Sequence, residues 1–175
     1  MPSSLSVQDL KKINHEKLKD FGKEFKKVSD YVIIDCAAGL GAEALSAIKM
    51  ADDLIVVTNP EMPAITDALK TIKTAQLEKK NVAGVIVTRV KKNNIEMQPT
   101  TVKDMLEVPV LGSIPEDVDV SRALNEKDAV VHVYPKSGAA RAYKEIASKI
   151  TGIPYNSDVD RESIFERIAK AFRKD

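Results

Sequence analysis

The sequence predicts an α/β fold in which helices cover both faces of a mostly parallel sheet. Short runs of β-branched and other apolar residues alternate along the chain with stretches whose apolar residues recur at helical spacing. The runs are nearly continuously apolar, which is typical of strands buried on both faces. Ligands of such sheets bind at the carboxyl ends of the strands, so the residues after each run are the first candidates for function.

The composition of the 175-residue chain is that of a soluble globular domain. Hydrophobic residues make up 43% and charged residues 30% of the sequence, and a chain of this length can bury a core of its own. Lysine and arginine number 27 against 26 acidic residues, so no nucleic-acid partner is expected. No apolar run approaches the roughly 20 residues that span a bilayer.

Cysteine and histidine are too few to predict a metal centre or nucleophilic catalysis. Cys36 is the single cysteine, which excludes an internal disulfide and is typical of a reducing cytosol. The negative charge of Asp35 is expected to raise the pKa of the Cys36 thiol, so we interpret this cysteine as a packing residue. His15 and His132 have no metal-ligand pattern and are expected to be exposed or hydrogen-bonded.

Five short apolar runs are expected to form the strands. The first, Tyr31–Asp35, is rich in the aromatic and β-branched residues that strands favour. The fourth is stopped by Pro115, because proline cannot donate a hydrogen bond to a ladder. The expected strands are residues 31–35, 54–58, 82–88, 108–114 and 130–134.

Helices are expected before, between and after these runs. Ser6 and Asp9 resemble a capping box at the start of the first helix. Pro63 suits the first turn of a later helix because its φ is already fixed. Asp119 and Ser137 are the expected starts of the last two helices of the domain. The expected helices are residues 6–27, 42–50, 63–75, 99–107, 119–125 and 137–150.

The end of the chain has a different pattern. We expect a domain over residues 1–150, a linker over 151–160 and an amphipathic helix over 161–175, whose apolar residues fall within one arc of about 100° opposite its basic residues. Such a helix suits a membrane interface. The alternative is a terminal helix docked on the domain's own core. The apolar residues are Ile164, Phe165, Ile168 and Phe172, and the basic residues are Arg167, Lys170, Arg173 and Lys174.

The first apolar run ends at Asp35, and a predicted turn that contains Gly39 and Gly41 follows it. Nucleotide hydrolases place a switch carboxylate in this way, beside Mg²⁺ and the γ-phosphate. The phosphate-binding loop G-x-x-x-x-G-K-[ST] that usually accompanies such a carboxylate is absent from the 175 residues. The alternative role of Asp35 is to cap the helix that follows it.

The ends of four apolar runs carry distinctive blocks, which are Tyr31-Val-Ile-Ile-Asp35-Cys-Ala-Ala-Gly39, Val57-Thr58-Asn59-Pro60-Glu61, Val87-Thr88-Arg89 and Gly112-Ser-Ile114-Pro115-Glu116-Asp117. In their order and spacing, the blocks resemble the ParA/MinD family of deviant-Walker ATPases. The resemblance covers nearly all of residues 2–150. The amphipathic end of the chain is similar to the membrane-targeting helix of MinD proteins.

The resemblance implies a P-loop NTPase-like fold that lacks its N-terminal strands. In the family's sheet, the phosphate-loop strand lies between the strands represented here by residues 31–35 and 54–58, so both would lose a hydrogen-bonding partner. Ala37 stands where the family commonly carries proline, which makes the turn less rigid. The opening Met1-Pro2-Ser3-Ser4 looks like a start placed within a longer sequence.

The resemblance also implies ATP and Mg²⁺ as cofactors. Asp35 would orient the attacking water and the outer shell of Mg²⁺, and Gly39 would present its N–H toward the γ-phosphate. Asn59 and Pro60 would close the second strand near the nucleotide. The adenine-side wall would be formed by Thr88, Arg89, Ile114, Pro115, Glu116 and Asp117.

Four residues of this wall have structural alternatives. Arg89 is equally interpretable as a surface ion-pairing residue, and Pro115 as the end of a strand. Glu116 and Asp117 are also a typical helix start.

By resemblance, the function is ATP-dependent dimerisation and membrane binding in cell-division site placement, with a second copy or a cell-division regulator as partner. The location would be cytoplasmic and peripheral, at the inner face of the cell membrane. Relatives that position flagella or chemosensory arrays fit the same blocks. Without a phosphate loop, this chain alone is expected to lack ATPase activity. The alternative is a non-catalytic, membrane-associated interaction module.

Overall fold

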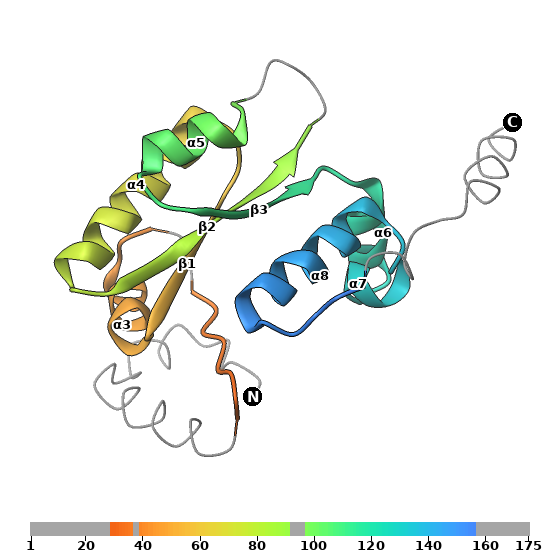
Figure 1. The fold of residues 1–175 in the computed structure, drawn as a ribbon, viewed down its shortest axis with the longest axis horizontal. Coiled ribbons are helices and arrows are strands. Elements are labelled where there is room, and N and C mark those ends of the chain that lie inside the picture. Colours follow the sequence, from red (N-terminus) through yellow and green to blue (C-terminus); the bar gives the residue numbers. More distant parts are fainter. Residues whose placement is uncertain (1–28, 37–38, 92–96, 157–175) are drawn as a thin grey trace, which may run out of the picture. The chain divides into compact units, whose positions relative to one another are not determined.

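A computed structural model describes residues 29–36, 39–91 and 97–156 of the chain. Within these residues, the sheet has three strands in the order β1-β2-β3, with β2 parallel to β3 (Figure 1). The prediction of an α/β fold with helices around a parallel sheet is confirmed. The elements are α3 (Ala42–Met50), β1 (Asp53–Thr58), α4 (Met62–Leu77), β2 (Asn81–Val90), α5 (Pro99–Leu106), β3 (Val110–Pro115), α6 (Val118–Asn125), α7 (Val130–Val133) and α8 (Gly138–Thr151).

Contacts along the chain define two compact units. The first consists of Met1–Leu54 and Lys70–Val82. In its described part, Ala44 and Ile48 are the buried residues of α3, as their helical spacing of four predicts. Lys80 lies between α4 and β2, and its Nζ donates to the carbonyl of Ala51 at 2.8 Å. This bond satisfies a carbonyl at the carboxyl end of α3.

The second unit consists of Ile55–Leu69 and Ala83–Asp175, and it contains most of the sheet. The helices α5 and α8 lie on opposite sides of β3 (Figure 1). On the α8 side, Ile114 packs in one buried cluster with Ala139 and Ile146. Covering both faces explains why β2 and β3 are apolar along nearly their whole length.

Two glycines allow close packing in this unit. A Cβ built on Gly112 would lie 2.4 Å from Cγ1 of Ile146, so only glycine lets α8 approach β3 this closely. Gly84 has a φ of +154°, and a Cβ there would lie 2.5 Å from the carbonyl oxygen of Pro109. Gly84 is therefore required both by its backbone conformation and by its neighbour.

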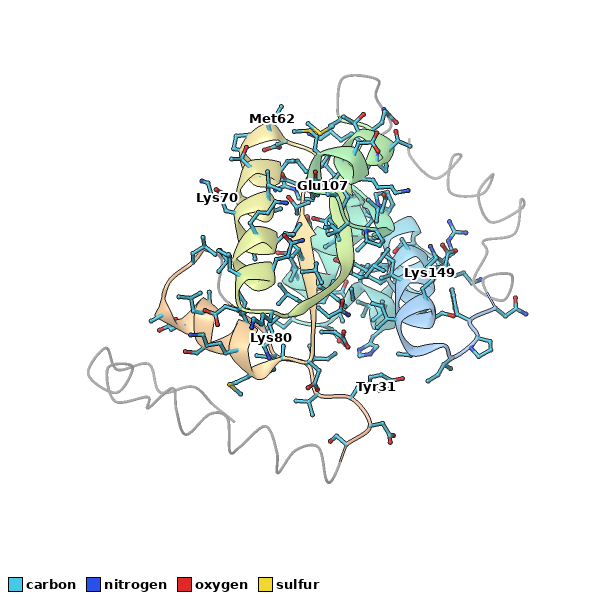
Figure 2. All side chains as sticks on the ribbon, turned by 60° about the vertical axis from the view of Figure 1, so that its left-hand side comes forward. Tyr31, Met62, Lys70, Lys80, Glu107 and Lys149 are labelled. Carbon is cyan, nitrogen blue, oxygen red and sulfur yellow. The ribbon has the colours of Figure 1, made fainter. Side chains whose placement is uncertain are left out.

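The two outer strands, β1 and β3, differ in the side chains that cover them. Lys149 of α8, labelled in Figure 2, donates through Nζ to the carbonyl of Leu111 in β3 at 3.1 Å. On β1, by contrast, Ile55 and Val57 are exposed, with Val57 at 63% of its full exposure. Lys149 thus covers a carbonyl of β3, whereas β1 presents apolar side chains on one face of the sheet.

The prediction of a strand at Tyr31–Asp35 is wrong. These residues have neither helical nor strand structure, and Ile33 is 93% exposed. A strand exists only when its backbone groups pair with a neighbour, and the described sheet consists of β1, β2 and β3. The β-favouring residues alone do not create a strand where the sheet offers no ladder.

The prediction of a strand at Val130–Tyr134 is also wrong, because Val130–Val133 forms the short helix α7. Asp128 accepts a hydrogen bond from the N–H of Ala129 at 2.7 Å, which begins the turn. Val130 is buried in a cluster with Ala123 and Ala140, so it packs against the helices α6 and α8 and not against a strand. Burial against α6 and α8 therefore overrides the β propensity of the valines.

The remaining expected elements in the described residues are present, with small shifts at their ends. The helix expected over 42–50 is α3, and the expected N-cap Ser137 accepts from the N–H of Ala140 at 3.1 Å. The cap of α6 is Asp117 and not Asp119, which lies in the first turn. The helix expected over 6–27 lies outside the described residues.

Candidate functional site

The carboxyl ends of the three strands meet at one edge of the sheet. The hydroxyl of Thr88, near the end of β2, donates to the carbonyl of Thr58 at the end of β1 at 3.0 Å. The N–H of Glu116, just after β3, donates to the carbonyl of Val90 at 2.9 Å. Three of the four sequence blocks are thereby brought together. In parallel sheets this edge is where ligands bind.

Arg89 is held in an unusual backbone conformation at this edge. Its φ is +56°, in the left-handed region, and the register of β2 against β3 shifts between Val87 and Val90. Its guanidinium lies 3.9 Å from the Glu116 carboxylate, and the Lys91 ammonium lies 3.8 Å from the other oxygen of that carboxylate. Lys91 was not among the predicted site residues, although it follows Arg89 by two positions.

These ion pairs are exposed, so each stabilises the fold little. The interpretation of Arg89 as a surface ion-pairing residue is confirmed as far as its contact with Glu116 goes. The left-handed backbone costs free energy, and such strain gathers at ligand sites. A role of Arg89 and Glu116 beside adenine stays a prediction.

Asn59 carries a polar atom without a partner. It follows Thr58, which is buried, and precedes Pro60, which is buried as well. The side-chain oxygen Oδ1 of Asn59 is inaccessible and has no hydrogen-bond donor in the described structure. Leaving an acceptor unsatisfied costs about 1–3 kcal/mol. An N–H or O–H group supplied from outside these residues fits this position.

Asp117 has a structural task at the same edge. Its Oδ1 accepts from the N–H of Asp119 at 3.0 Å, and its Oδ2 accepts from the N–H of Ala139 at 3.0 Å. One carboxylate therefore caps both α6 and α8. The interpretation of Asp117 as a helix-start residue is confirmed, and its contact with adenine stays a prediction. The neighbouring Pro115 ends β3, and Ile114 is buried under α8.

Asp35 and Gly39 belong to the first unit. Asp35 is exposed, and Gly39 has a φ of +98° with open space where a Cβ would be. The helix α3 begins after Gly41 without a side-chain cap, so the alternative that Asp35 caps this helix is wrong. The switch role of Asp35 and the γ-phosphate contact of Gly39 stay predictions.

The environment of Cys36 keeps its thiol protonated. Partial burial raises the pKa of Cys36, and the negative charges of Asp35 and Glu43 raise it further. The predicted direction is confirmed, with burial as the larger cause. The Cys36 side chain is nevertheless exposed, so its interpretation as a packing residue is wrong. Because the thiolate is the reactive form, this cysteine is not activated.

Metal ligands and membrane segments can be assessed within residues 29–36, 39–91 and 97–156. No group of three or more His, Cys, Asp or Glu side chains there is arranged to hold a metal ion. His132 is exposed and lies with Nδ1 3.0 Å from Asp128 Oδ1, as expected of a hydrogen-bonded histidine. No helix in those ranges is long and apolar enough to cross a bilayer. The proposed membrane-binding residues 164–174 lie outside them.

Similar sequences cover most of the chain. A ParA family model, described as NUBPL iron-transfer P-loop NTPase, matches residues 13–151. An uncharacterized ATP-binding protein of Methanocaldococcus jannaschii is 38% identical over 172 residues, covering 97% of this chain and 65% of the relative. The septum site-determining protein MinD of Synechocystis is 32% identical over 149 residues, covering 82% of this chain and 56% of the relative. The chain thus spans less than two thirds of the length of either relative.

Solved structures share the fold. MinD of Pyrococcus horikoshii, complexed with Mg-ADP, aligns with a TM-score of 0.80 at 27% identity, covering 93% of this chain and 65% of that one. A chain of the MinC:MinD cell division protein complex of Aquifex aeolicus aligns with a TM-score of 0.74 at 28% identity, covering 82% of this chain and 62% of that one.

Proposed function

Because the chain belongs to the ParA/MinD family of P-loop NTPases, we propose that it is part of a MinD-like ATPase that acts in placing the cell-division site. The observation that carries the proposal is the meeting of three strand ends at one edge of the sheet, with Thr88 bonded to Thr58 and Glu116 beside Arg89. The MinD structure with Mg-ADP supports a nucleotide as the ligand of that edge.

The residues at the edge suit the base end of a nucleotide. The unsatisfied Oδ1 of Asn59 accepts hydrogen bonds, and adenine carries an amino group that donates them. Arg89 offers a planar cation that stacks on an aromatic base, with Glu116 holding it from one side. Thr88 and Pro115 complete the proposed wall, with Asp117 acting through the helices it caps and Ile114, whose side chain is buried under α8, supporting the wall from the core.

Catalysis is assigned to the first unit. Asp35 would orient the attacking water and the water shell of Mg²⁺, and Gly39 would offer its N–H to the γ-phosphate. When bound, Mg²⁺ would neutralise charge on the phosphates. The positive φ of Gly39 and the open space beside it leave room for such an approach.

Membrane binding would depend on nucleotide through dimerisation. A single amphipathic helix of residues 161–175 binds a membrane weakly, and two helices in one dimer bind more tightly through their effective concentration. The protein would then be cytoplasmic and peripheral at the inner face of the cell membrane. Its partner would be a second copy or a cell-division regulator, as the MinC:MinD complex of a relative suggests.

The 175-residue chain alone is expected to show no ATPase activity or very little. No G-x-x-x-x-G-K-[ST] loop is present in its sequence to hold the phosphates. The test is a titration of the chain with a fluorescent ATP analogue, with and without Mg²⁺. Mg²⁺-dependent binding in the micromolar range would contradict this part of the proposal.

A non-catalytic, membrane-associated module is the alternative function, and the missing phosphate loop is the observation that favours it. Liposome co-sedimentation separates the two. Binding without ATP supports the module. Binding only with ATP supports the ATPase and would contradict the expectation that this chain alone does not hold the nucleotide. Phe165→Glu should abolish binding in either case, and Ser163→Glu, on the polar side of the predicted helix, should not. Equal binding by both variants would contradict the membrane role.

A further inference from the structure

The chain reverses its direction after α8 and runs back along this helix (Figure 1). We propose that residues 152–156, the strap, return the chain toward the carboxyl edge of the sheet, so that this edge faces the membrane bound by the predicted amphipathic helix. This orientation rests on the proposed membrane binding by residues 161–175 and adds which side of the fold meets the lipid. The residues that set it all belong to the second unit.

Two contacts show that α8 runs antiparallel to β3. At the start of α8, the N–H of Ala139 donates to the carboxylate of Asp117, just after the carboxyl end of β3, at 3.0 Å. Near the end of α8, Lys149 Nζ donates to the carbonyl of Leu111, in the first half of β3, at 3.1 Å. The last turn of α8 therefore lies toward the amino end of β3, and a chain that continued straight on would leave the fold on the side away from the candidate site.

Local hydrogen bonds build the reversal. Gly152 has a φ of +72°, in the left-handed region that ends many helices, and its N–H donates to the carbonyl of Ser148 at 2.9 Å. The next N–H, that of Ile153, donates to the Thr151 hydroxyl at 3.2 Å. The same hydroxyl donates to the carbonyl of Ala147 at 2.9 Å. The chain thus leaves the direction of the helix within two residues.

The returning end of the strap is held by a cation over an aromatic ring. Lys144 Nζ lies 5.6 Å from the centre of the Tyr155 ring. Because Lys144 is in the middle of α8, the strap has returned along about half of the helix. At 1.5 Å per residue, Lys144 lies about 9 Å along the axis from Gly138, the first residue of α8. Residues 157–160 can span up to about 13 Å, so the amphipathic helix can begin at the carboxyl edge.

The first test measures the strap in the full chain without lipid or nucleotide. Spin labels are attached at Lys136→Cys, just before α8, and at Asp160→Cys, in a Cys36→Ser background that removes the exposed native thiol. Electron paramagnetic resonance should give one short, narrow distance. Tyr155→Ala and Lys144→Ala should each raise the population at longer distances about two- to fivefold, because each removes the contact between the cation and the ring.

The matched control is Tyr143→Ala, which removes an exposed tyrosine next to Lys144 and should leave the distance unchanged. Thermal melting confirms that each variant is folded. A long, broad distance in the wild type, or the same distribution in all variants, would overturn the strap. Because neither lipid nor nucleotide is present, these outcomes are separate from those of the proposed ATPase and of membrane binding.

The second test measures which edge approaches the lipid. A fluorophore is placed at Lys136→Cys, at the carboxyl edge, or at Asp104→Cys, which is exposed near the end of α5 at the opposite edge. The protein is bound to vesicles of phosphatidylglycerol and phosphatidylcholine that carry a nitroxide lipid as quencher. Quenching should be stronger at position 136, and Tyr155→Ala should reduce the difference between the two positions.

Two outcomes of the vesicle experiment count against the orientation. Equal quenching at the two positions of bound protein, or stronger quenching at position 104, would overturn it while leaving membrane binding intact. Absence of binding to the vesicles would contradict the membrane role and the orientation together, whereas the distance measurement would still decide whether the strap exists.

Discussion

Residues 31–35 and the strand β2 have similar sequences and different structures. Both are rich in β-branched residues and both end in a block typical of a nucleotide site. Val87 in β2 is 1% exposed, whereas Ile33 is 93% exposed. The difference is the neighbour, since β2 has β3 beside it and helices on its faces. A strand is therefore a property of a pair of segments, and the same apolar pattern is stable only where a partner completes the ladder.

The largest expected effect comes from breaking the paired region at Gly84. Gly84→Ser would place a Cβ 2.5 Å from the Pro109 carbonyl oxygen in a backbone conformation that other residues avoid. We expect a loss of about 3 kcal/mol or more in the free energy of unfolding, measured with urea. Gly41→Ser is the matched control, because its Cβ meets open space at a helix N-cap, and stability should be unchanged or slightly higher. Equal effects would contradict the packing argument.

The second-largest expected effect compares a buried residue of β2 with an exposed residue of the segment 31–35. Val87→Ala removes two buried methyl groups and should lower the free energy of unfolding by about 2.5 kcal/mol. Ile33→Ala removes exposed groups and should change it by less than about 0.5 kcal/mol in dilute, monomeric protein. Both are read from urea unfolding at the same concentration. A large loss for Ile33→Ala would mean that residues 31–35 are packed in the monomer.

A smaller effect is expected at the cap shared by two helices. Asp117→Ala removes the acceptor for the N–H groups of Asp119 and Ala139, and should cost about 2 kcal/mol. Ser137→Ala removes a single cap bond, to Ala140, and should cost about 1 kcal/mol. Urea unfolding of the two variants gives the loss in the free energy of unfolding for each, and the two losses are compared. If Ser137→Ala costs as much as Asp117→Ala, the carboxylate does not hold both helices.

The smallest effect is a dependence on pH at α7. The Ala129 N–H bond, followed by the His132 side chain, lowers the pKa of Asp128 below its ordinary 3.8. A lowered pKa means that the carboxylate stabilises the fold above the ordinary value and that this contribution disappears as the pH falls through the folded-state pKa. Wild type should therefore exceed Asp128→Asn in melting temperature at neutral pH, and the gap should close in acid. A gap that persists below that range would contradict the assignment.

Local patterns predicted most helices and strands correctly, because their signals lie within each segment. Helical spacing of apolar residues gave the bounds of α3, and the Ser137 cap gave the start of α8. The errors arose where a distant partner decides. Tyr31–Asp35 needs a neighbour that the described sheet does not contain, and Val130 finds its burial between α6 and α8.

The candidate site was predictable in its location and less so in its details. Strand ends in a parallel sheet share an edge, so Thr58, Thr88 and Glu116 were expected together from their order alone. The left-handed backbone of Arg89 depends on the register shift against β3, which no single-strand pattern contains. The unsatisfied Asn59 oxygen depends on which groups surround it, and the sequence specifies only that an amide is present.

The double cap at Asp117 also has a consequence for local opening of the fold. Its two oxygens join the first turns of α6 and α8, which are separated by about 20 residues of chain. If the first turn of either helix opens, it loses its hydrogen bond to the Asp117 carboxylate, and the same carboxylate holds the first turn of the other helix. The amides of Asp119 and Ala139 should therefore exchange with solvent deuterium at similar rates, as members of one cooperative unit. Covalent distance along the chain is thus a poor guide to which parts of this fold open together.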